Sequence, residues 1–307
     1  MKNKNNYQSL LDLSLVSVNG EIQASKDARI PIFDRGFLYG DSIYEVVYSR
    51  DGQVIFLDEH LDRLYESASL LRMDLFFTRE ELVNDILLLL KASTLKAAYL
   101  RIVVTRGETE ITLNPDSSFH NNIVLITKPK PIYPPKFYTH GMHLQITSVE
   151  SNHIKSTNPN AKSGNYLNNV MAMGEAKMRG ADDAIMLNGK GQVTEGPTFN
   201  IWMVKDNTLY TPPGDSGLLK GITRDKLIYL CGENNISLKI ECFTPEFLYT
   251  ADEVFITSST RGIIPVYQID DQVYGQSIDD WPVTLKLSRI YEKLILKQLG
   301  NSKYKYL

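Results

Sequence analysis

Residues 161–172 have the sequence Ala-Lys-Ser-Gly-Asn-Tyr-Leu-Asn-Asn-Val-Met-Ala, and this stretch decides how the rest of the chain is interpreted. Lys162 stands before a predicted helix, and its small neighbours Ser163 and Gly164 would let another molecule approach closely. A lysine in such a place can lose solvent, which lowers its pKa and favours an amine nucleophile or a Schiff base. The alternative is a solvated lysine at a helix start, because lysines are mostly exposed.

The chain before residue 128 contains strand patterns followed by helix patterns. Residues 14–18 (Ser-Leu-Val-Ser-Val) are predicted as a strand that ends at Asn19-Gly20, a strong hairpin signal. A second hairpin is predicted from residues 42–48 to residues 53–56 around Asp51-Gly52. The other elements predicted in this part are helices at 59–71 and 80–92 and strands at 98–105 and 122–127.

A change in composition divides the chain at residues 128–135, where four of eight residues are proline. Such a segment favours an extended, semi-rigid connection. We therefore predict a small N-terminal α/β domain at 1–127, a proline-rich linker at 128–135 and a large C-terminal domain at 136–307. In the C-terminal domain the predicted elements are strands at 142–149, 183–187 and 199–204 and helices at 166–178 and 223–231. The expected fold class is therefore mixed α and β with two domains.

Composition excludes several classes of protein. The 307 residues are 43% hydrophobic and 22% charged, and the net charge is −3, so no basic excess favours nucleic acid or an anionic membrane. No apolar run approaches the ~20 residues of a membrane helix, and residues 1–8 lack the apolar core of a signal peptide. Cys231 and Cys242 have no metal or redox spacing, and the five histidines have none either, which predicts a cytoplasmic protein without a metal site. The first ten and last ten residues are expected to be frayed.

Three further segments could carry chemistry. Glu195 lies before a predicted strand, where a carboxylate could protonate or hold a heterocyclic nitrogen; the alternative is a polar loop residue. Residues 220–225 (Lys-Gly-Ile-Thr-Arg-Asp) open a helix and could bind an anion through free N–H groups, or Thr223 could simply be the N-cap. Residues 257–262 (Thr-Ser-Ser-Thr-Arg-Gly) follow a strand and could bind phosphate or carboxylate, or form an ordinary polar loop.

Together these segments resemble the fold-type IV pyridoxal-phosphate enzymes, the class IV aminotransferases. The resemblance covers about residues 32 to 266, and six pieces occur in the family's order. The pieces are Asp34-Arg35-Gly36 with Tyr39-Gly40-Asp41, His60-Leu61-Asp62-Arg63-Leu64, residues 162–167, Thr194-Glu195-Gly196 with Asn200, Gly221-Ile222-Thr223-Arg224, and Ser258-Ser259 with Pro265-Val266.

The resemblance implies a role for individual residues toward pyridoxal 5′-phosphate. Lys162 matches the lysine that forms the Schiff base and moves the proton, and Glu195 matches the carboxylate at the pyridine nitrogen. Lys155 is the rival lysine, but it lacks the Asn-Tyr-Leu that follows Lys162. The other matches are Arg63, Ile222, Thr223 and Ser259 for the phosphate, Tyr166 beside the ring hydroxyl and Leu219 as an apolar contact.

The helical pattern gives Arg63 a different interpretation from the resemblance. Arg63 lies opposite the apolar stripe of Leu61, Leu64 and Ala68, so the pattern alone predicts a surface arginine. Only the resemblance gives it a role.

Substrate choice is divided between two branches of the family. Tyr44-Glu45-Val46 resembles the strand motif of D-amino acid aminotransferases, but the Arg-x-His trap of those enzymes is missing after Thr105-Arg106-Gly107. Tyr99 and Arg101 match a Tyr-x-Arg pair of branched-chain enzymes. A substrate carboxylate needs a guanidinium, and the candidates are Arg101 and Arg261, with Arg106 third; Tyr44 and Thr260 are expected beside the substrate. The alternative for Arg261 is a loop salt bridge.

The resemblance implies ping-pong transamination between an amino acid and a 2-oxo acid, a cofactor in the cleft between the domains, and a homodimer. Nucleic acid and membrane partners are not expected. A related lyase that releases pyruvate from aminodeoxychorismate is less favoured, because Val46 stands where that branch has threonine. The presence of Arg101 and Arg261 disfavours an amine transaminase. Lys162 and Glu195 together argue against a relative that binds cofactor or metabolite without turnover.

Overall fold

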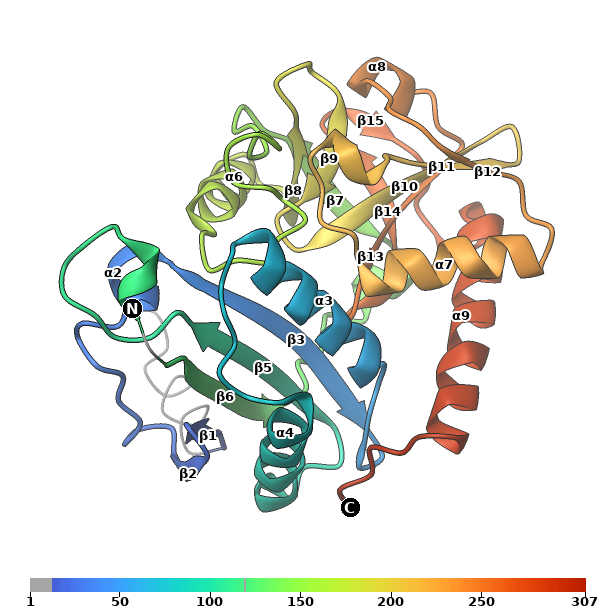
Figure 1. The fold of residues 1–307 in the computed structure, drawn as a ribbon. Coiled ribbons are helices and arrows are strands. Elements are labelled where there is room, and N and C mark those ends of the chain that lie inside the picture. Colours follow the sequence, from blue (N-terminus) through green and yellow to red (C-terminus); the bar gives the residue numbers. More distant parts are fainter. Residues whose placement is uncertain (1–12, 119) are drawn as a thin grey trace. The chain divides into compact units, whose positions relative to one another are not determined.

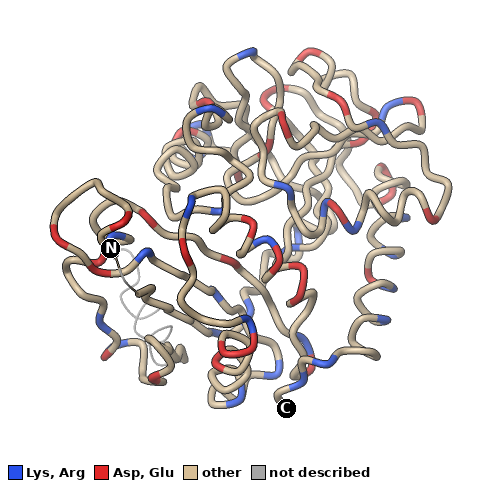
Figure 2. The backbone as a smooth tube through the Cα atoms, in the orientation of Figure 1, with Lys and Arg blue, Asp and Glu red and all other residues tan. Residues whose placement is uncertain are grey.

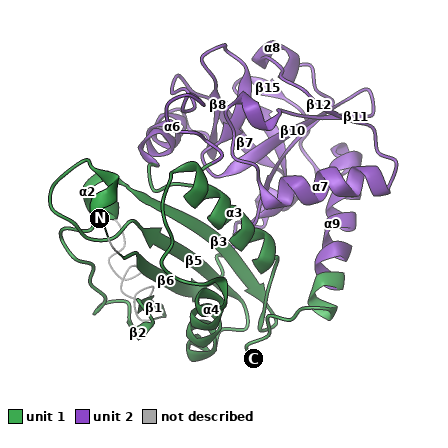
Figure 3. Cartoon of the chain, in the orientation of Figure 1, with its two compact units in different colours: residues 1–131, 161–165, 297–307 green, residues 132–160, 166–296 purple. Residues whose placement is uncertain are grey.

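The computed structural model describes residues 13–118 and 120–307, and the chain divides into two compact units (Figure 3). The first unit contains the described residues up to Pro131 together with 161–165 and 297–307; the second contains 132–160 and 166–296. The predicted C-terminal domain of residues 136–307, by contrast, includes residues 161–165 and 297–307. The first ten residues, predicted to fray, lie outside the described part of the chain.

The first unit is built on a six-stranded antiparallel sheet with the order β2-β1-β6-β5-β3-β4 (Figure 1). Both predicted hairpins are present, and Asn19 and Gly20 have the positive φ angles that such turns need. Strand β6 continues through Lys128 and Pro129, which pair with Tyr99 and Ala98, so the first two residues of the predicted linker are strand. The strands are β1 (Leu15–Val18), β2 (Glu21–Ala24), β3 (Ser42–Arg50), β4 (Gln53–Val54), β5 (Ala98–Thr105) and β6 (Asn122–Pro129).

Helices α3 (Leu57–Leu70) and α4 (Arg79–Ser93) bury their apolar sides against one face of this sheet. Ile43 and Val47 alternate inward along β3 and are completely buried in the same core. Helix α4 begins with a capping box in which Thr78 and Glu81 satisfy each other's backbone N–H groups. The short helix α2 (Arg35–Tyr39) precedes β3 and is capped by the Asp34 carboxylate.

Residues 161–165 belong to the first unit because their backbone pairs with the free edge of β3. Tyr44 N–H donates to the Lys162 carbonyl at 2.9 Å, and Gly164 N–H donates to the Ser42 carbonyl at 2.8 Å. A Cβ atom at Gly164 would overlap the Ser42 hydroxyl as it is placed here, so glycine allows this close approach without any shift of Ser42. Pairing between segments so far apart in the chain is not visible in any local pattern of the sequence.

The second unit is built on a nine-stranded sheet that closes on itself, since β9 pairs with both β8 and β10. Its enclosed face carries a core of aliphatic and aromatic residues. The strands are β7 (Met142–Ile146), β8 (Asp183–Leu187), β9 (Val193–Gly196), β10 (Phe199–Lys205), β11 (Thr208–Thr211), β12 (Leu238–Ile240), β13 (Glu253–Ser258), β14 (Gly262–Ile269) and β15 (Gln272–Val273). The helices are α5 (Lys136–Thr139), α6 (Leu167–Met178), α7 (Ile222–Glu233), α8 (Pro245–Leu248) and α9 (Pro282–Gly300), the last of which ends in the first unit.

Basic and acidic residues are interspersed along both units (Figure 2), in keeping with the small net charge. Over the described ranges, no helix is both long and apolar enough to cross a membrane.

The prediction that the last ten residues are frayed is wrong. Residues 298–300 belong to helix α9, and the segment after it docks on the first unit. Tyr306 N–H donates to the Gly52 carbonyl at 3.0 Å, and the Tyr306 side chain is buried in the core beneath the helices. Its hydroxyl contacts Ser49 and donates to the Leu95 carbonyl at 2.7 Å. The segment after α9 looks like a polar tail in the sequence. It is held on the first unit by backbone pairing with the β3–β4 turn and by the buried Tyr306 side chain.

Replacing Tyr306 by phenylalanine should lower the free energy of unfolding by about 1 to 3 kcal/mol, because the buried Ser49 hydroxyl and Leu95 carbonyl lose a partner. Urea unfolding followed by circular dichroism measures the change. Tyr229→Phe is the matched control, because the Tyr229 side chain is exposed. Equal stability of the two variants would show that the hydrogen bonds of the Tyr306 hydroxyl contribute nothing to stability.

Candidate active site

The backbone of Lys162 is held from two sides inside the first unit. Its N–H group donates to the Ser67 hydroxyl on α3 at 3.0 Å, and its carbonyl accepts from Tyr44 on β3. The side chain is half-buried, and its Nζ lies 4.4 Å from the centre of the Tyr44 ring. The rival Lys155 is exposed in a loop of the second unit. Lys162 is therefore a lysine with a fixed backbone and a side chain directed over an aromatic ring, not a solvated lysine at a helix start.

The same tyrosine ring carries a second cation. The Arg101 guanidinium carbon lies 3.9 Å from the centre of the Tyr44 ring, a favourable cation–π contact. The register of β3 and β5 places Val46 opposite Arg101 and Tyr48 opposite Tyr99, so Tyr44, Tyr99 and Arg101 share one face of the sheet. The structure thus brings together four predicted site residues of the first unit: Lys162, Tyr44, Tyr99 and Arg101.

Arg63 lies on the other side of β3 and is buried, so its prediction as a surface arginine from the helical pattern is wrong. Its Nε and Nη2 donate to the two oxygens of Glu45 at 2.7 and 2.8 Å, and His60 Nδ1 lies 2.7 Å from the same carboxylate. Helix α3 has a second inward stripe beside its apolar one, formed by His60, Arg63 and Ser67 at spacings of three and four residues. This stripe faces the inward-pointing Glu45, and the charge pair explains the burial.

The electrostatics of this group follow from its burial. Burial alone would raise the pKa of Glu45, but the Arg63 guanidinium and His60 outweigh it and hold that pKa well below its usual range. Burial lowers the pKa of His60, and the Glu45 carboxylate only partly opposes this. Near neutral pH the group therefore consists of an ionised carboxylate, a guanidinium and a neutral imidazole.

In the second unit, Asn200 links Glu195 to the loop before α7. Its amide Nδ2 donates to the Glu195 carboxylate at 3.3 Å and to the Leu219 carbonyl at 2.8 Å. A Cβ atom at Gly221 would overlap the Asn200 side chain, so the loop can pass this close only with glycine. Strand register places Glu195 beside Asn200 and Asn200 beside Thr257. The predicted residues Glu195 and Leu219 thus lie at one corner of the closed sheet.

Helix α7 begins at this corner with its N-terminal amides uncapped by any side chain of the described residues. Gly221 is the N-cap residue, while Ile222 and Thr223 are buried in the first turn. The alternative of Thr223 as the N-cap is therefore wrong; its hydroxyl lies 3.3 Å from the Tyr291 hydroxyl instead. Arg224, in the same turn, is buried. Burial lowers the pKa of its guanidinium, and the charges of Asp225 and Glu195 oppose that shift. Such a helix start favours an anion.

The turn between β13 and β14 is held in place by aromatic and charged groups. The Tyr133 hydroxyl bonds to the Thr260 hydroxyl at 2.9 Å. Arg261 forms an ion pair with Asp183 at 3.0 Å and donates to the Thr198 hydroxyl. Burial raises the pKa of Asp183, and the Arg261 charge opposes that shift. Arg261 therefore has the loop salt bridge that the sequence left open as its alternative.

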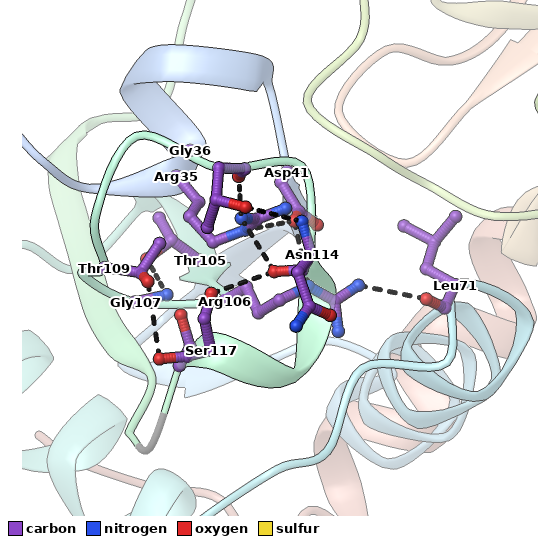
Figure 4. Close-up of polar contacts among 12 residues, drawn as sticks. Arg35, Gly36, Asp41, Leu71, Thr105, Arg106, Gly107, Thr109, Asn114 and Ser117 are labelled. Carbon is purple, nitrogen blue, oxygen red and sulfur yellow. Dashed lines mark hydrogen bonds and ion pairs between the residues drawn. The ribbon is translucent and has the colours of Figure 1, made fainter.

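Arg106, the third candidate for a substrate carboxylate, is also used within the fold (Figure 4). Its guanidinium contacts Asp41 at 2.8 Å and the carbonyls of Arg72 and Leu71 at 2.9 and 3.0 Å. Asp41 also binds Arg35 at 2.8 Å. Of the three candidate arginines, only Arg101 forms no ion pair with any residue that the structure describes.

Ser67, Asn200 and Asp183 hold predicted site residues in place, although the sequence predicts no role for any of them. For Ser67 a signal existed, because it continues the His60 and Arg63 stripe one turn further. Asn200 belongs to the family motif around Glu195, but its contact with Leu219 depends on a loop 19 residues away. Asp183 begins a buried strand and meets its partner 78 residues later in the chain, so no local pattern indicated it.

Comparison with known proteins identifies the family of the chain. The family model described as amino-transferase class IV matches residues 42–269. A putative branched-chain-amino-acid aminotransferase of Methanocaldococcus jannaschii is 42% identical over 258 residues, which cover 84% of this chain and 88% of that protein. D-alanine aminotransferase of Bacillus licheniformis is 32% identical over 287 residues, covering 94% and 99%.

The fold is also similar to that of solved aminotransferase structures. The branched-chain aminotransferase of the archaeon Thermoproteus uzoniensis with norvaline superposes with a TM-score of 0.84 at 30% identity, covering 92% of this chain and 95% of that chain. The predicted family, the mixed α/β fold and the prediction of an enzyme are confirmed, and the lyase and non-catalytic alternatives are not favoured. The chain belongs to the class IV aminotransferase family and is a transaminase.

Proposed function

We propose that this transaminase uses pyridoxal 5′-phosphate to move an amino group from a branched-chain L-amino acid to a 2-oxo acid in two successive half-reactions. The observation that carries the proposal is the pairing of the Lys162 amine and the Arg101 guanidinium on one tyrosine ring. Transamination of an amino acid requires two such groups. One is an amine that transfers a proton, and the other is a cation that binds the substrate carboxylate.

The chemistry of the donor set fits a phosphorylated pyridine aldehyde. Lys162 offers an amine and Glu195 a carboxylate, while the start of α7 offers uncapped amides. The Ser258 hydroxyl oxygen is buried and has no hydrogen-bond partner among the described residues, and Thr257 beside it pairs with Asn200 at the same corner. The proposed contacts are Arg63, Ile222, Thr223 and Ser259 to phosphate, Glu195 to the ring nitrogen, and Tyr166 and Leu219 to the ring.

When bound, the cofactor supplies an electron sink for the pair released at the substrate Cα atom. Lys162 would hold the cofactor through its amine, and the same Nζ atom would act as the base that takes the proton from the substrate Cα atom. Because Ser67 and Tyr44 hold both backbone groups of Lys162, only its side chain has to move between these tasks. The hydrogen bond from Asn200 to Glu195 would hold that carboxylate in place for a contact with the ring nitrogen.

A second candidate substrate class is D-amino acids. Tyr44-Glu45-Val46 resembles the D-specific strand motif, and the Bacillus licheniformis relative is named a D-alanine aminotransferase. The Tyr99 and Arg101 pair on β5 favours the branched-chain class.

We also propose a homodimer in the cytoplasm. Phe33, Phe37, Ile111 and Leu113 are all more than half exposed. They lie on two segments joined by the hydrogen bond from Arg35 Nη1 to the Thr112 carbonyl at 2.7 Å. An exposed apolar group of this kind favours a protein partner, and a second copy is the family expectation. The free thiols of Cys231 and Cys242 agree with a reducing compartment.

The test of the function is a single half-reaction followed by the cofactor's visible absorbance. Holoenzyme is mixed separately with L-leucine, L-glutamate, D-alanine and D-glutamate. Loss of the absorbance band with the L-pair is expected, loss with the D-pair alone would move the enzyme to the D-amino acid class, and no change with any of them would overturn the proposal. Borohydride should fix the cofactor on the Lys162 peptide in wild type and in the matched control Lys155→Ala, but on no peptide in Lys162→Ala.

Replacing Arg101 by glutamine should raise KM for the amino acid by roughly 10- to 100-fold, the value of a charged hydrogen-bonded contact, while kcat falls much less. Steady-state kinetics measure both constants. Arg106→Lys is the comparison variant, since it should lower the temperature of unfolding and leave KM close to wild type. An unchanged KM in Arg101→Gln would remove Arg101 from the substrate site.

Light scattering of the holoenzyme in solution should give twice the mass of one chain. The double variant Phe37→Asp with Leu113→Asp should dissociate to the mass of one chain, because it places charge on the exposed apolar group. Val273→Asp, at an exposed apolar residue of the second unit, is the matched control. A wild-type enzyme with the mass of one chain would contradict the proposed dimer.

A further inference from the structure

Glu45 is a completely buried carboxylate whose two oxygens both accept hydrogen bonds. Its Oε1 accepts from Arg63 Nε, and its Oε2 accepts from Arg63 Nη2, His60 Nδ1 and the Val46 N–H. Nothing in the proposed reaction uses this residue, because its side chain lies on the core face of β3, opposite the face that carries Tyr44.

A contribution to stability is by itself a weak explanation for the buried pair of Glu45 and Arg63. Removing two charges from water is costly, and well-packed apolar residues of similar volume are often as stable or more so. The pair does, however, fix the guanidinium plane, because two parallel hydrogen bonds leave no freedom of rotation. What Glu45 determines is therefore the direction in which the rest of the Arg63 guanidinium points.

One turn of α3 connects this pair to Lys162. The Ser67 hydroxyl donates to the Arg63 carbonyl at 2.8 Å and accepts from the Lys162 N–H at 3.0 Å. Arg63 and Lys162 are the two residues of the first unit assigned to the cofactor, and both depend on the same buried polar stripe. A change in that stripe would move the phosphate contact and the amine together.

We propose that Glu45 is a positioning residue that orients Arg63 toward the phosphate group of the cofactor. This inference rests on the proposed function, since it takes the phosphate as the partner of Arg63. A role in orienting Arg63 and a role in offsetting its charge predict opposite changes in phosphate affinity when Glu45 is removed. If the carboxylate only offsets charge, its removal leaves a more positive site that binds phosphate more tightly. If it orients the guanidinium, its removal weakens phosphate binding because the arginine has to be ordered by the ligand.

The experiment compares the affinities of the apoenzyme for pyridoxal 5′-phosphate and for pyridoxal, which lacks the phosphate. Both probes can react with Lys162, so the ratio of the two dissociation constants isolates the phosphate contact. In Glu45→Gln the preference for the phosphorylated probe should fall by roughly 10- to 100-fold, the value of a lost hydrogen bond to a charged group. An unchanged or increased preference would overturn the inference.

Asp34→Asn is the matched control. Asp34 is also a completely buried carboxylate of the first unit, and it accepts hydrogen bonds from Gly36 N–H, Thr105 and Asn122. Its loss should lower the temperature of unfolding without changing the phosphate preference. An equal fall in preference in Asp34→Asn would mean that any damage to this unit has the same effect, which also overturns a specific role for Glu45.

A second series keeps the inference testable if Glu45→Gln does not fold. His60→Ala removes one donor to Glu45 and should reduce the phosphate preference in the same direction. His60→Asn restores a donor near the position of Nδ1 and should recover it. Absence of any fall in His60→Ala, or of recovery in His60→Asn, counts against the positioning role.

Failure of the inference is distinguishable from failure of the function. Wild-type apoenzyme that binds neither probe, or shows no absorbance change with any amino acid, overturns the proposed function and the inference with it. Wild type that prefers the phosphorylated probe, with Glu45→Gln preferring it equally, overturns only the role of Glu45.

Discussion

The backbone pairing of residues 162 and 164 with the edge of β3 is the constraint on which the predicted site residues of the first unit depend. It places the lysine beside a strand and a helix that are distant in sequence, and Ser67 and Tyr44 fix both of its backbone groups. Main-chain hydrogen bonds and a close contact at Gly164 therefore set the position of the Lys162 backbone, from which the side chain extends over the Tyr44 ring. Catalysis needs reacting groups held to a fraction of an ångström, and rigid elements provide this better than loops.

Strand β3 separates two environments. Its outer face presents Tyr44, with Lys162 and Arg101 against the ring, whereas its inner face buries Glu45 among α3 side chains. The alternation of side chains along one strand thus places an aromatic surface with two cations back to back with a buried charge pair. A one-residue slip of β3 would exchange the two sets and destroy both, so the pairing with β5 and with residues 162–164 specifies the register strongly.

In the second unit, the predicted site residues lie at the ends of strands. Closure of the sheet by β9 places Glu195 beside Asn200, and Asn200 in turn holds the loop that precedes α7. Arg261 supports the neighbouring turn through its ion pair with Asp183, whose buried carboxylate is thereby matched by an opposite charge. Structural residues therefore support three features of this unit. These are the Glu195 carboxylate, the start of helix α7 and the hydroxyl-rich turn between β13 and β14.

The sequence by itself determined most elements of regular structure and the family. Turn residues such as Asn19-Gly20, the helical spacing after Glu59 and the segment around Lys162 are local signals, and local propensity and periodicity are sufficient to interpret them. Only the tertiary structure decided that Arg63 is buried, that residues 161–165 pair with β3 and that Tyr306 anchors the chain end. Each of these depends on a partner far away in the chain: the inward-facing Glu45, the open edge of a strand, and the Leu95 carbonyl. A periodicity records which side of a helix is apolar, but whether a charged residue beside that stripe is buried depends on whether the opposing element offers the opposite charge.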